Sequence, residues 1–264
     1  MLELYQFELS HYSEKVRLIL DYKGLEYRKI EVTPGVGQME LYRLSGQIQV
    51  PVLKDGDMVV ADSTEIALYL ERKYPDPPLI PADPYQRGLC LLMEEWADES
   101  LGLKGRKVFL GAFNQNQNFR KTLLPASTPD LVKSLVGAVP SELLEFLGTG
   151  VGLGKDDIRF ATTGIKQDLE ALCLILQDRP YLVGDRPTLA DLAVAGLSII
   201  LKFPDLRYLD VPASMLGKGV PGIADDSFFS VFFNWRDRLY AEYRQPLGTP
   251  LPTTDVPPTS IEIE

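Results

Sequence analysis

The segment 75–84, PDPPLIPADP, holds five prolines in ten residues and divides the chain into two unequal parts. Proline has no backbone N–H and a fixed φ, so neither a helix interior nor a central strand tolerates such a run. The chain before this segment alternates between strand-like and helical patterns, whereas the chain after it is mainly helical. We therefore expect a domain at 1–75, a proline-rich linker at 76–84 and a helical domain at 85–244.

The first part of the chain predicts the element order βαβαββα. This order combines a parallel crossover with an antiparallel hairpin in one small mixed sheet, which is the thioredoxin-like pattern. The expected fold class is therefore a thioredoxin-like α/β domain followed by an all-α domain. The strand-like segments are 1–7, 26–32 and a hairpin at 50–62, and the helical segments are 10–24, 39–44 and 63–74.

The second part has helical spacing of its apolar residues over most of its length, but the region 105–155 is enlarged and weakly patterned. The tail 245–264 contains five prolines and is expected to be extended. Long helices are expected at 85–113, 156–177, 188–201 and 227–244, loops at 114–119 (NQNQNF) and 148–155 (GTGVGLGK), and short helices at 128–136 and 140–147.

The net charge of the chain is −10. Nucleic acids and anionic membrane surfaces bind basic patches, so this charge argues against either as the main partner. No segment approaches the roughly 20 continuous apolar residues of a membrane helix, and no basic and apolar leader opens the chain. We therefore expect a cytoplasmic protein.

The chain contains two cysteines, Cys90 and Cys173, and one histidine, His11. Because there is no CxxC pair and no second histidine, we expect no zinc site and no metal cofactor. The two cysteines lie far apart in apolar stretches, which favours buried free thiols in a reducing compartment.

The turn after the first strand, FELSHYSEKVR, places the hydroxyl of Ser10 at the start of the next helix. A thiol held beside Ser10 would be stabilised as a thiolate by a donated O–H bond and by the positive end of the helix dipole. The same position suits a serine that only caps the helix. Spacing alone does not separate these two interpretations.

Two further segments have the chemistry to bind a peptide-like ligand. The backbone of Val50, ahead of Pro51, would pair with a peptide laid alongside it, although a proline is also ordinary at a strand start. Asp62 begins a capping-box pattern; alternatively, it binds an amine while Ser63 and nearby N–H groups bind a carboxylate. A γ-glutamyl head carries both of these groups.

A hydroxyl turn, then Val-Pro, then Asp-Ser, on this element order, resembles the cytosolic glutathione transferase family. The resemblance covers 1–104 and 156–202. Within the second range, RPYLVGDRPTLADLAVAG is similar to the signature around the family's sixth helix, with Thr188 and Asp191 as a structural capping pair. The resemblance implies glutathione as co-substrate, transfer of its thiolate to a small hydrophobic electrophile, and a homodimer.

Carried over by position, the resemblance makes Ser10 the residue that activates the thiol. Ser10 stands where the family has a serine or cysteine ahead of K/R-V-R, an omega-, zeta- and tau-like motif present here as residues 15–17. We expect Lys15 and Arg17 themselves to lie on a solvated helix face. The residues matched to glutathione binding are Gln49, Val50, Pro51, Asp62 and Ser63.

Two departures from the omega-like pattern bear on the chemistry. Ser10 stands where those members have cysteine, and His11 stands where they have proline. A serine cannot form a mixed disulfide with glutathione, so conjugation or isomerisation is expected rather than thiol reduction. Ser13, Tyr5 and Tyr12 are alternative hydroxyls for thiolate activation.

The electrophile pocket is expected between the two domains, partly on the helix that carries Glu94, Glu95 and Trp96. The leading hypothesis is a glutathione S-transferase. A second is a glutathione-dependent isomerase or peroxidase. A third is a non-catalytic, transferase-like binding module, which the irregular region 105–155 favours.

Overall fold

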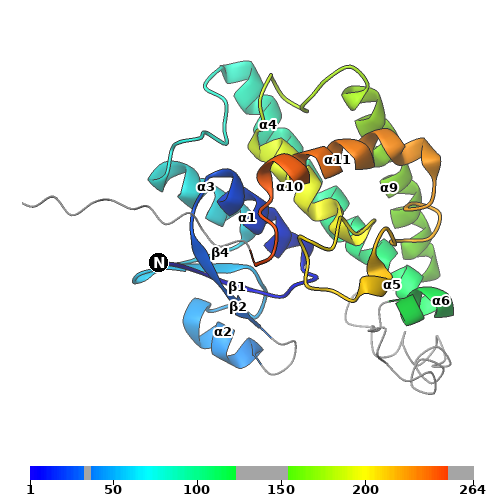
Figure 1. Cartoon of the computed structure of the whole chain (residues 1–264), viewed down its shortest axis with the longest axis horizontal. Helices are drawn as coiled ribbons and strands as arrows, with labels where there is room; N and C mark the ends of the chain where they lie inside the picture. The colour runs from blue at the N-terminus through cyan, green and yellow to red at the C-terminus, as the bar shows by residue number, and fades with distance from the viewer. Residues whose placement is uncertain (33–36, 123–153, 249–264) are drawn as a thin grey trace, which may run out of the picture.

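A four-stranded mixed sheet with the strand order β2-β1-β3-β4 forms the centre of the N-terminal half (Figure 1). The structure is a computed structural model that describes residues 1–32, 37–122 and 154–248. β1 pairs in parallel with β2 and antiparallel with β3, and β3 forms a hairpin with β4, which confirms the predicted thioredoxin-like sheet. The strands are β1 Leu2–Gln6, β2 Tyr27–Glu31, β3 Val52–Asp55 and β4 Met58–Ala61.

Three helices cover the two faces of this sheet: α1 His11–Tyr22, α2 Gln38–Ser45 and α3 Ser63–Lys73. α1 and α3 lie on one face and α2 lies on the other (Figure 1). Strand side chains alternate between the two faces. Leu4 and Leu53 join the main core with α1 and α3, whereas Val52 packs with Leu41 of α2.

α1 begins and ends where its sequence signals a helix boundary. Ser10 is the N-cap, and its Oγ accepts a hydrogen bond from the Ser13 N–H at 3.2 Å. Gly24 lies just beyond the last turn with a φ of 63°, a conformation that glycine adopts readily. Most of α1 is buried, because it packs against the sheet, α3 and α10 (Leu189–Leu197).

The prediction that Lys15 and Arg17 lie on a solvated face is wrong, since both are 0% exposed. Helix α10 from the C-terminal half packs against α1 beside Lys15, whereas Arg17 is enclosed by its ion pairs with Glu8 and Glu14. Gly196 permits the close approach, because a Cβ there would lie only 2.6 Å from the Cα of Lys15. The local pattern shows polar residues on α1 but cannot show that a distant helix packs over them.

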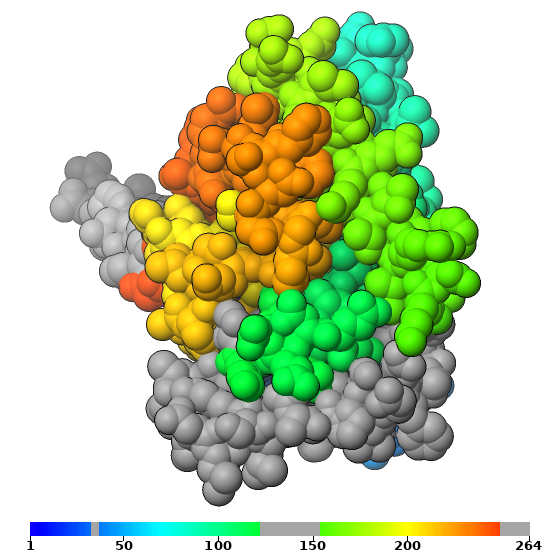
Figure 2. All heavy atoms as spheres, turned by 90° about the vertical axis from the view of Figure 1, so that its right-hand side faces the viewer, coloured from blue at the N-terminus to red at the C-terminus, as the bar shows by residue number. Residues whose placement is uncertain are grey.

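The C-terminal half is helical, as predicted. Figure 2 shows one face of it, where α11 (orange) lies beside α9 (light green) and above α5 and α6 (green). Helix α10 is buried along its length and opens with the predicted capping box of Thr188 and Asp191. The helices are α4 Pro84–Ala97, a π-helix Asp98–Lys104, α5 Gly105–Gln115, α6 Gln117–Thr122, α9 Lys155–Leu176, α10 and α11 Ser230–Tyr243, with 3-10 turns at Ser198–Ile200, Ala213–Met215 and Ser227–Phe229.

The run 114–119, expected to be a loop, is mostly helical. It holds the end of α5 and the start of α6, separated only at Asn116, whose backbone is extended. The Asn116 side chain accepts a hydrogen bond from the Phe119 N–H at 3.0 Å, so one amide caps the second helix. The short helices expected at 128–136 and 140–147, and the tail beyond residue 248, lie outside the described residues.

Both cysteines are free thiols, and the expectation that they are buried holds for Cys90 but not for Cys173, which is half-buried. Across the described ranges, no helix combines the length and the apolar character that crossing a membrane requires.

Candidate functional site

A cleft of about 700 Å³ lies between the N-terminal half and the start of α5. One wall comes from the ends of N-terminal elements, and the other comes from the π-helix and α5. The lining residues are Phe7, Leu9, Ser10, His11, Tyr12, Val32, Gln38, Gln47, Ile48, Gln49, Val50, Pro51, Asp62, Ser63, Asp98, Glu99, Leu103, Arg106, Phe109, Leu110 and Ile200. The six residues predicted to activate or bind glutathione are all among them.

Ser10 lies in the turn between β1 and α1 and is half-buried at the cleft. The turn is closed by a hydrogen bond of 2.9 Å from the Ser10 N–H to the Phe7 carbonyl. Its Oγ accepts the bond that caps α1, and among the described residues its hydroxyl proton has no acceptor. Capping and thiol activation are therefore compatible, because they use different parts of one hydroxyl group.

The three alternative hydroxyls are placed less favourably than Ser10. Tyr12 lines the cleft, but its OH donates to the Asp98 carbonyl at 3.0 Å, and burial raises its pKa. Ser13 is fully buried, and its Oγ has no hydrogen-bond partner within the described part of the chain. Tyr5 packs with the small core under α2, and neither it nor Ser13 lines the cleft.

The segment ahead of β3 forms another part of the same wall. Gln49 is exposed, Val50 is half-buried and Pro51 is buried, and the Val50–Pro51 peptide bond is cis. The side chain of Gln47 donates to the Gln49 carbonyl at 3.1 Å, which ties this segment together. Val50 thus lines the cleft just before β3 begins at Val52.

Asp62 and Ser63 bring the start of α3 to the cleft. The Asp62 Oδ1 accepts hydrogen bonds from the N–H groups of Thr64 and Glu65 at 2.8 and 3.2 Å, which caps the helix. Asp62 has a φ of 76°, a strained conformation for a residue other than glycine, and such strain is often found at ligand sites. Ser63 is buried at the first position of the helix.

A buried polar cluster lies behind Asp62 and Ser63. The Nζ of Lys15 donates to Glu94 at 2.5 Å, to Asp98 at 2.8 Å and to the hydroxyl of Thr64 at 3.1 Å. Burial raises the pKa of Asp98, although the Lys15 charge opposes this shift. The cluster joins α1 and α3 to the C-terminal half, and sequence reasoning missed it because its members are far apart along the chain.

The pocket was expected partly on the helix that carries Glu94, Glu95 and Trp96, and the cleft is lined by the π-helix that continues directly from this helix. Glu94 is buried, and its carboxylate forms an ion pair with Lys15. Neither Glu95 nor Trp96 lines the cleft. The lining of this wall begins one turn after Glu94, at Asp98, where the π-helix starts. The sequence signal for this wall is the helical spacing of the apolar residues Leu103, Phe109 and Leu110.

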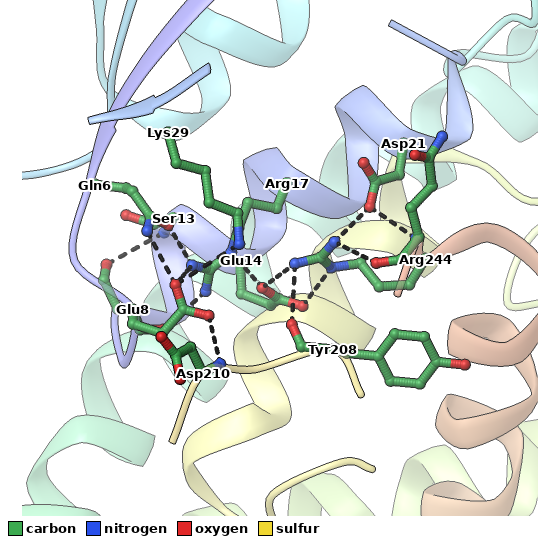
Figure 3. Close-up of polar contacts among 12 residues, drawn as sticks. Gln6, Glu8, Ser13, Glu14, Arg17, Asp21, Lys29, Tyr208, Asp210 and Arg244 are labelled. Atoms are coloured by element: carbon green, nitrogen blue, oxygen red, sulfur yellow. Dashed lines mark hydrogen bonds and ion pairs between the residues drawn. The ribbon is translucent and has the colours of Figure 1, made fainter. Parts of the chain in front are cut away.

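A buried ionic network fixes the segment that leads to Ser10 (Figure 3). Arg17 donates to the Glu8 carbonyl at 2.8 Å and pairs with the carboxylates of Glu8 at 2.9 Å and Glu14 at 2.5 Å. Glu14 in turn pairs with Arg244 at 2.9 Å. The turn that carries Ser10 is thereby tied to the far end of the described chain.

His11 adjoins Ser10 and is neutral near pH 7. Burial lowers its pKa from 6.5 to about 4, with the nearby charge of Arg106 acting in the same direction, and its Nε2 lies 3.1 Å from the Gly102 carbonyl oxygen. Because the pKa of His11 is lower in the folded state than in the unfolded state, the unfolded state takes up the proton first. The free energy of unfolding therefore decreases as pH falls from the unfolded pKa towards the folded pKa.

We therefore expect a His11→Asn variant to lose part of the pH dependence of stability. Between pH 7 and pH 5, the free energy of unfolding of the wild type should fall by about 2 kcal/mol relative to the variant. Denaturant unfolding at the two pH values measures this difference, and His11 is the only histidine in the chain. A constant difference across this range would contradict the neutral assignment.

Within the described residues, no group of three or more His, Cys, Asp or Glu side chains is arranged to hold a metal ion.

Residues 4–78 match a family model described as the N-terminal domain of glutathione S-transferase, and residues 154–213 match the model of its C-terminal domain. Glutathione S-transferase Z2 of Arabidopsis thaliana is 38% identical over 91 residues, which are 33% of this chain and 41% of that protein. The aligned part thus spans about two fifths of the length of this curated relative.

Solved structures extend the likeness over most of the chain. The beta-etherase LigF of Sphingobium sp. strain SYK-6 has a TM-score of 0.66 at 22% identity, covering 91% of this chain and 95% of that one. The theta-class glutathione S-transferase of Xanthomonas axonopodis pv. citri, solved with glutathione bound, has a TM-score of 0.59 at 21% identity, covering 95% and 98%. At these identities the structures establish the shared fold. Matches to both domain models, together with this fold, show that the chain belongs to the cytosolic glutathione S-transferase family.

Proposed function

We propose that this protein is a glutathione S-transferase in which Ser10 activates the glutathione thiol for attack on a small hydrophobic electrophile. Family membership supports glutathione as the co-substrate. The observation that carries the proposal is the cleft wall on which Ser10, Val50, Pro51, Asp62 and Ser63 meet. These residues come from the ends of separate elements, which the fold brings together at one cleft.

The start of α3 suits the γ-glutamyl end of glutathione. Both capping bonds of Asp62 use Oδ1, so Oδ2 is left to accept a bond from the ammonium group. Ser63 and the positive end of α3 suit the neighbouring carboxylate. Val50 suits the cysteinyl backbone, which would pair with it as an added strand.

The proposed chemical step is nucleophilic attack by the thiolate. The thiol loses its proton to solvent, and the Ser10 hydroxyl donates a hydrogen bond to the resulting sulfur anion. Lowering the thiol pKa by one unit takes about 1.4 kcal/mol, which is within the range of one hydrogen bond to a charged group. The sulfur electron pair then forms the C–S bond, and the leaving group departs with the electron pair of the broken bond.

Titration calorimetry with glutathione and turnover of chlorodinitrobenzene test the proposal together. Binding with turnover is the expected result. Heat without turnover of this halide, or of a panel of other electrophiles, would favour the non-catalytic binding module. Turnover of isomerisable or peroxide substrates alone would favour the isomerase or peroxidase, and absence of heat at millimolar glutathione would contradict the glutathione site itself.

A Ser63→Ala variant is expected to raise the KM for glutathione by roughly tenfold, because one hydrogen bond to a charged carboxylate is lost. The value of kcat should change much less, since Ser63 lies away from the sulfur. Ser227→Ala, at an exposed turn outside the cleft, is the matched control and should leave both constants unchanged. An unaltered KM in Ser63→Ala would remove this residue from the glutathione site.

The same proposal includes the organisation of the whole protein. We assign glutathione binding to a domain at 1–75 and most of the acceptor wall to a helical domain at 85–244, joined by the linker 76–84. We also propose a homodimer in the cytoplasm, which is typical of the family, and sedimentation or light scattering tests the dimer.

A further inference from the structure

The stretch from Leu103 to Leu110, at the end of the π-helix and the start of α5, forms the acceptor wall of the cleft, and one of its lining side chains is charged. Leu103, Arg106, Phe109 and Leu110 line the cleft at helical spacing, so they lie on one face of the helix. Three of the four are apolar. Arg106 is therefore the one charged group on a stretch whose other lining side chains are apolar.

Arg106 is exposed and makes no hydrogen bond or ion pair with any residue that the structure describes. It is the only lysine or arginine among the described residues that line the cleft, because Lys15 is buried behind the wall and held by Glu94 and Asp98. The neighbouring His11 is neutral and adds no positive charge. An unpaired guanidinium in a cleft is well suited to bind a planar anion in a bidentate manner.

The acidic groups that line the cleft lie outside the stretch 103–110. Asp62 accepts a bond from the Thr64 N–H, and Asp98 of the π-helix accepts one from the Thr64 hydroxyl at 3.1 Å, so both carboxylates lie at the start of α3. Glu99 follows Asp98 directly and precedes Arg106 by about two turns of helix. Two of the three carboxylates thus lie at the proposed ammonium site, whereas the one cation adjoins the apolar residues of the acceptor wall.

We propose that Arg106 binds a carboxylate on the acceptor substrate, whose apolar body packs against Phe109 and Leu110. The inference rests on the proposed function and deepens it, because it names the acceptors as hydrophobic electrophiles that carry an anionic group. The glycine carboxylate of glutathione has the same chemistry and is the other source of an anion in this cleft. An experiment with two acceptors separates the two sources.

The acceptors are chlorodinitrobenzoate and its neutral amide, each used with the full-length wild type, Arg106→Gln, Arg106→Lys and the control Lys107→Gln. Lys107 neighbours Arg106 but does not line the cleft. In Arg106→Gln, the ratio of kcat/KM for the benzoate to that for the amide should fall roughly tenfold, the effect of one charge-assisted hydrogen bond. Arg106→Lys should recover part of this ratio, and Lys107→Gln should keep it.

An unchanged ratio in Arg106→Gln would overturn the inference. A tenfold rise in the KM for glutathione, equal with both acceptors, would also overturn it, because the anion would then be the glycine carboxylate. Turnover of the amide by the wild type tests the proposed function separately. If the wild type turns over the amide but the ratio does not respond to Arg106, the inference fails and the proposed function stands.

Discussion

Replacing Ser10 by alanine is expected to lower kcat by about a hundredfold, the typical effect of removing one hydrogen-bond donor to a reacting anion. Glutathione should still bind, because Val50, Asp62 and Ser63 are untouched. The pKa of the bound thiol should rise towards its value in free glutathione. The ultraviolet absorbance of the thiolate, followed against pH in the binary complex, measures this rise directly.

Two variants separate activation from the capping role of Ser10. Loss of the cap costs about 1 kcal/mol of stability in an alanine variant, but only a few tenths in a glycine variant. Ser10→Gly should therefore lose turnover as Ser10→Ala does while unfolding nearly as the wild type does. Ser13→Ala, outside the cleft, should retain turnover. Full activity in both Ser10 variants, with loss in Tyr12→Phe, would move the activating role to Tyr12.

Much of the fold was predictable because its signals are local. The hairpin turn, the helix ends at Ser10 and Gly24, and the capping box at Thr188 each depend on residues within a few positions of one another. The family match then assembles these elements correctly. The site residues were predictable for the same reason, since each stands at the end of an element; their roles stay predictions.

What the sequence could not reveal depends on contacts between distant segments. Lys15 meets Glu94 across 79 positions, and Arg244 meets Glu14 across 230. A polar residue on an amphipathic helix usually faces water, so a pattern-based interpretation assigns it to the surface. The π-helix at 98–104, which carries several lining residues of the cleft, was also not predicted, because its residues read as part of one continuous helical pattern.

The buried network around Glu14 is therefore the main structural feature that sequence reasoning missed. Burial alone would raise the pKa of Glu14, but the charges of Arg17 and Arg244 outweigh it and lower the pKa from 4.5 to about 2. A carboxylate with a depressed folded pKa contributes stability that is present above its unfolded pKa and is lost as pH falls through the folded one. This contribution should disappear between about pH 4.5 and pH 2.

An Arg244→Leu variant should lower the free energy of unfolding by about 3–5 kcal/mol, because it leaves buried carboxylates without their partner. Arg244 bonds Glu14 at 2.9 Å and Asp21 at 2.5 Å, and all three side chains are at most 3% exposed. The control Arg207→Leu breaks an exposed pair with Asp205 and should change stability by no more than about 0.5 kcal/mol. Denaturant unfolding at pH 7 compares the variants, and a loss below about 1 kcal/mol in Arg244→Leu would contradict a stabilising role for this network. Because the network also holds the Glu8 carbonyl two residues before Ser10, the variant should show a lower kcat as well, at temperatures where it remains folded.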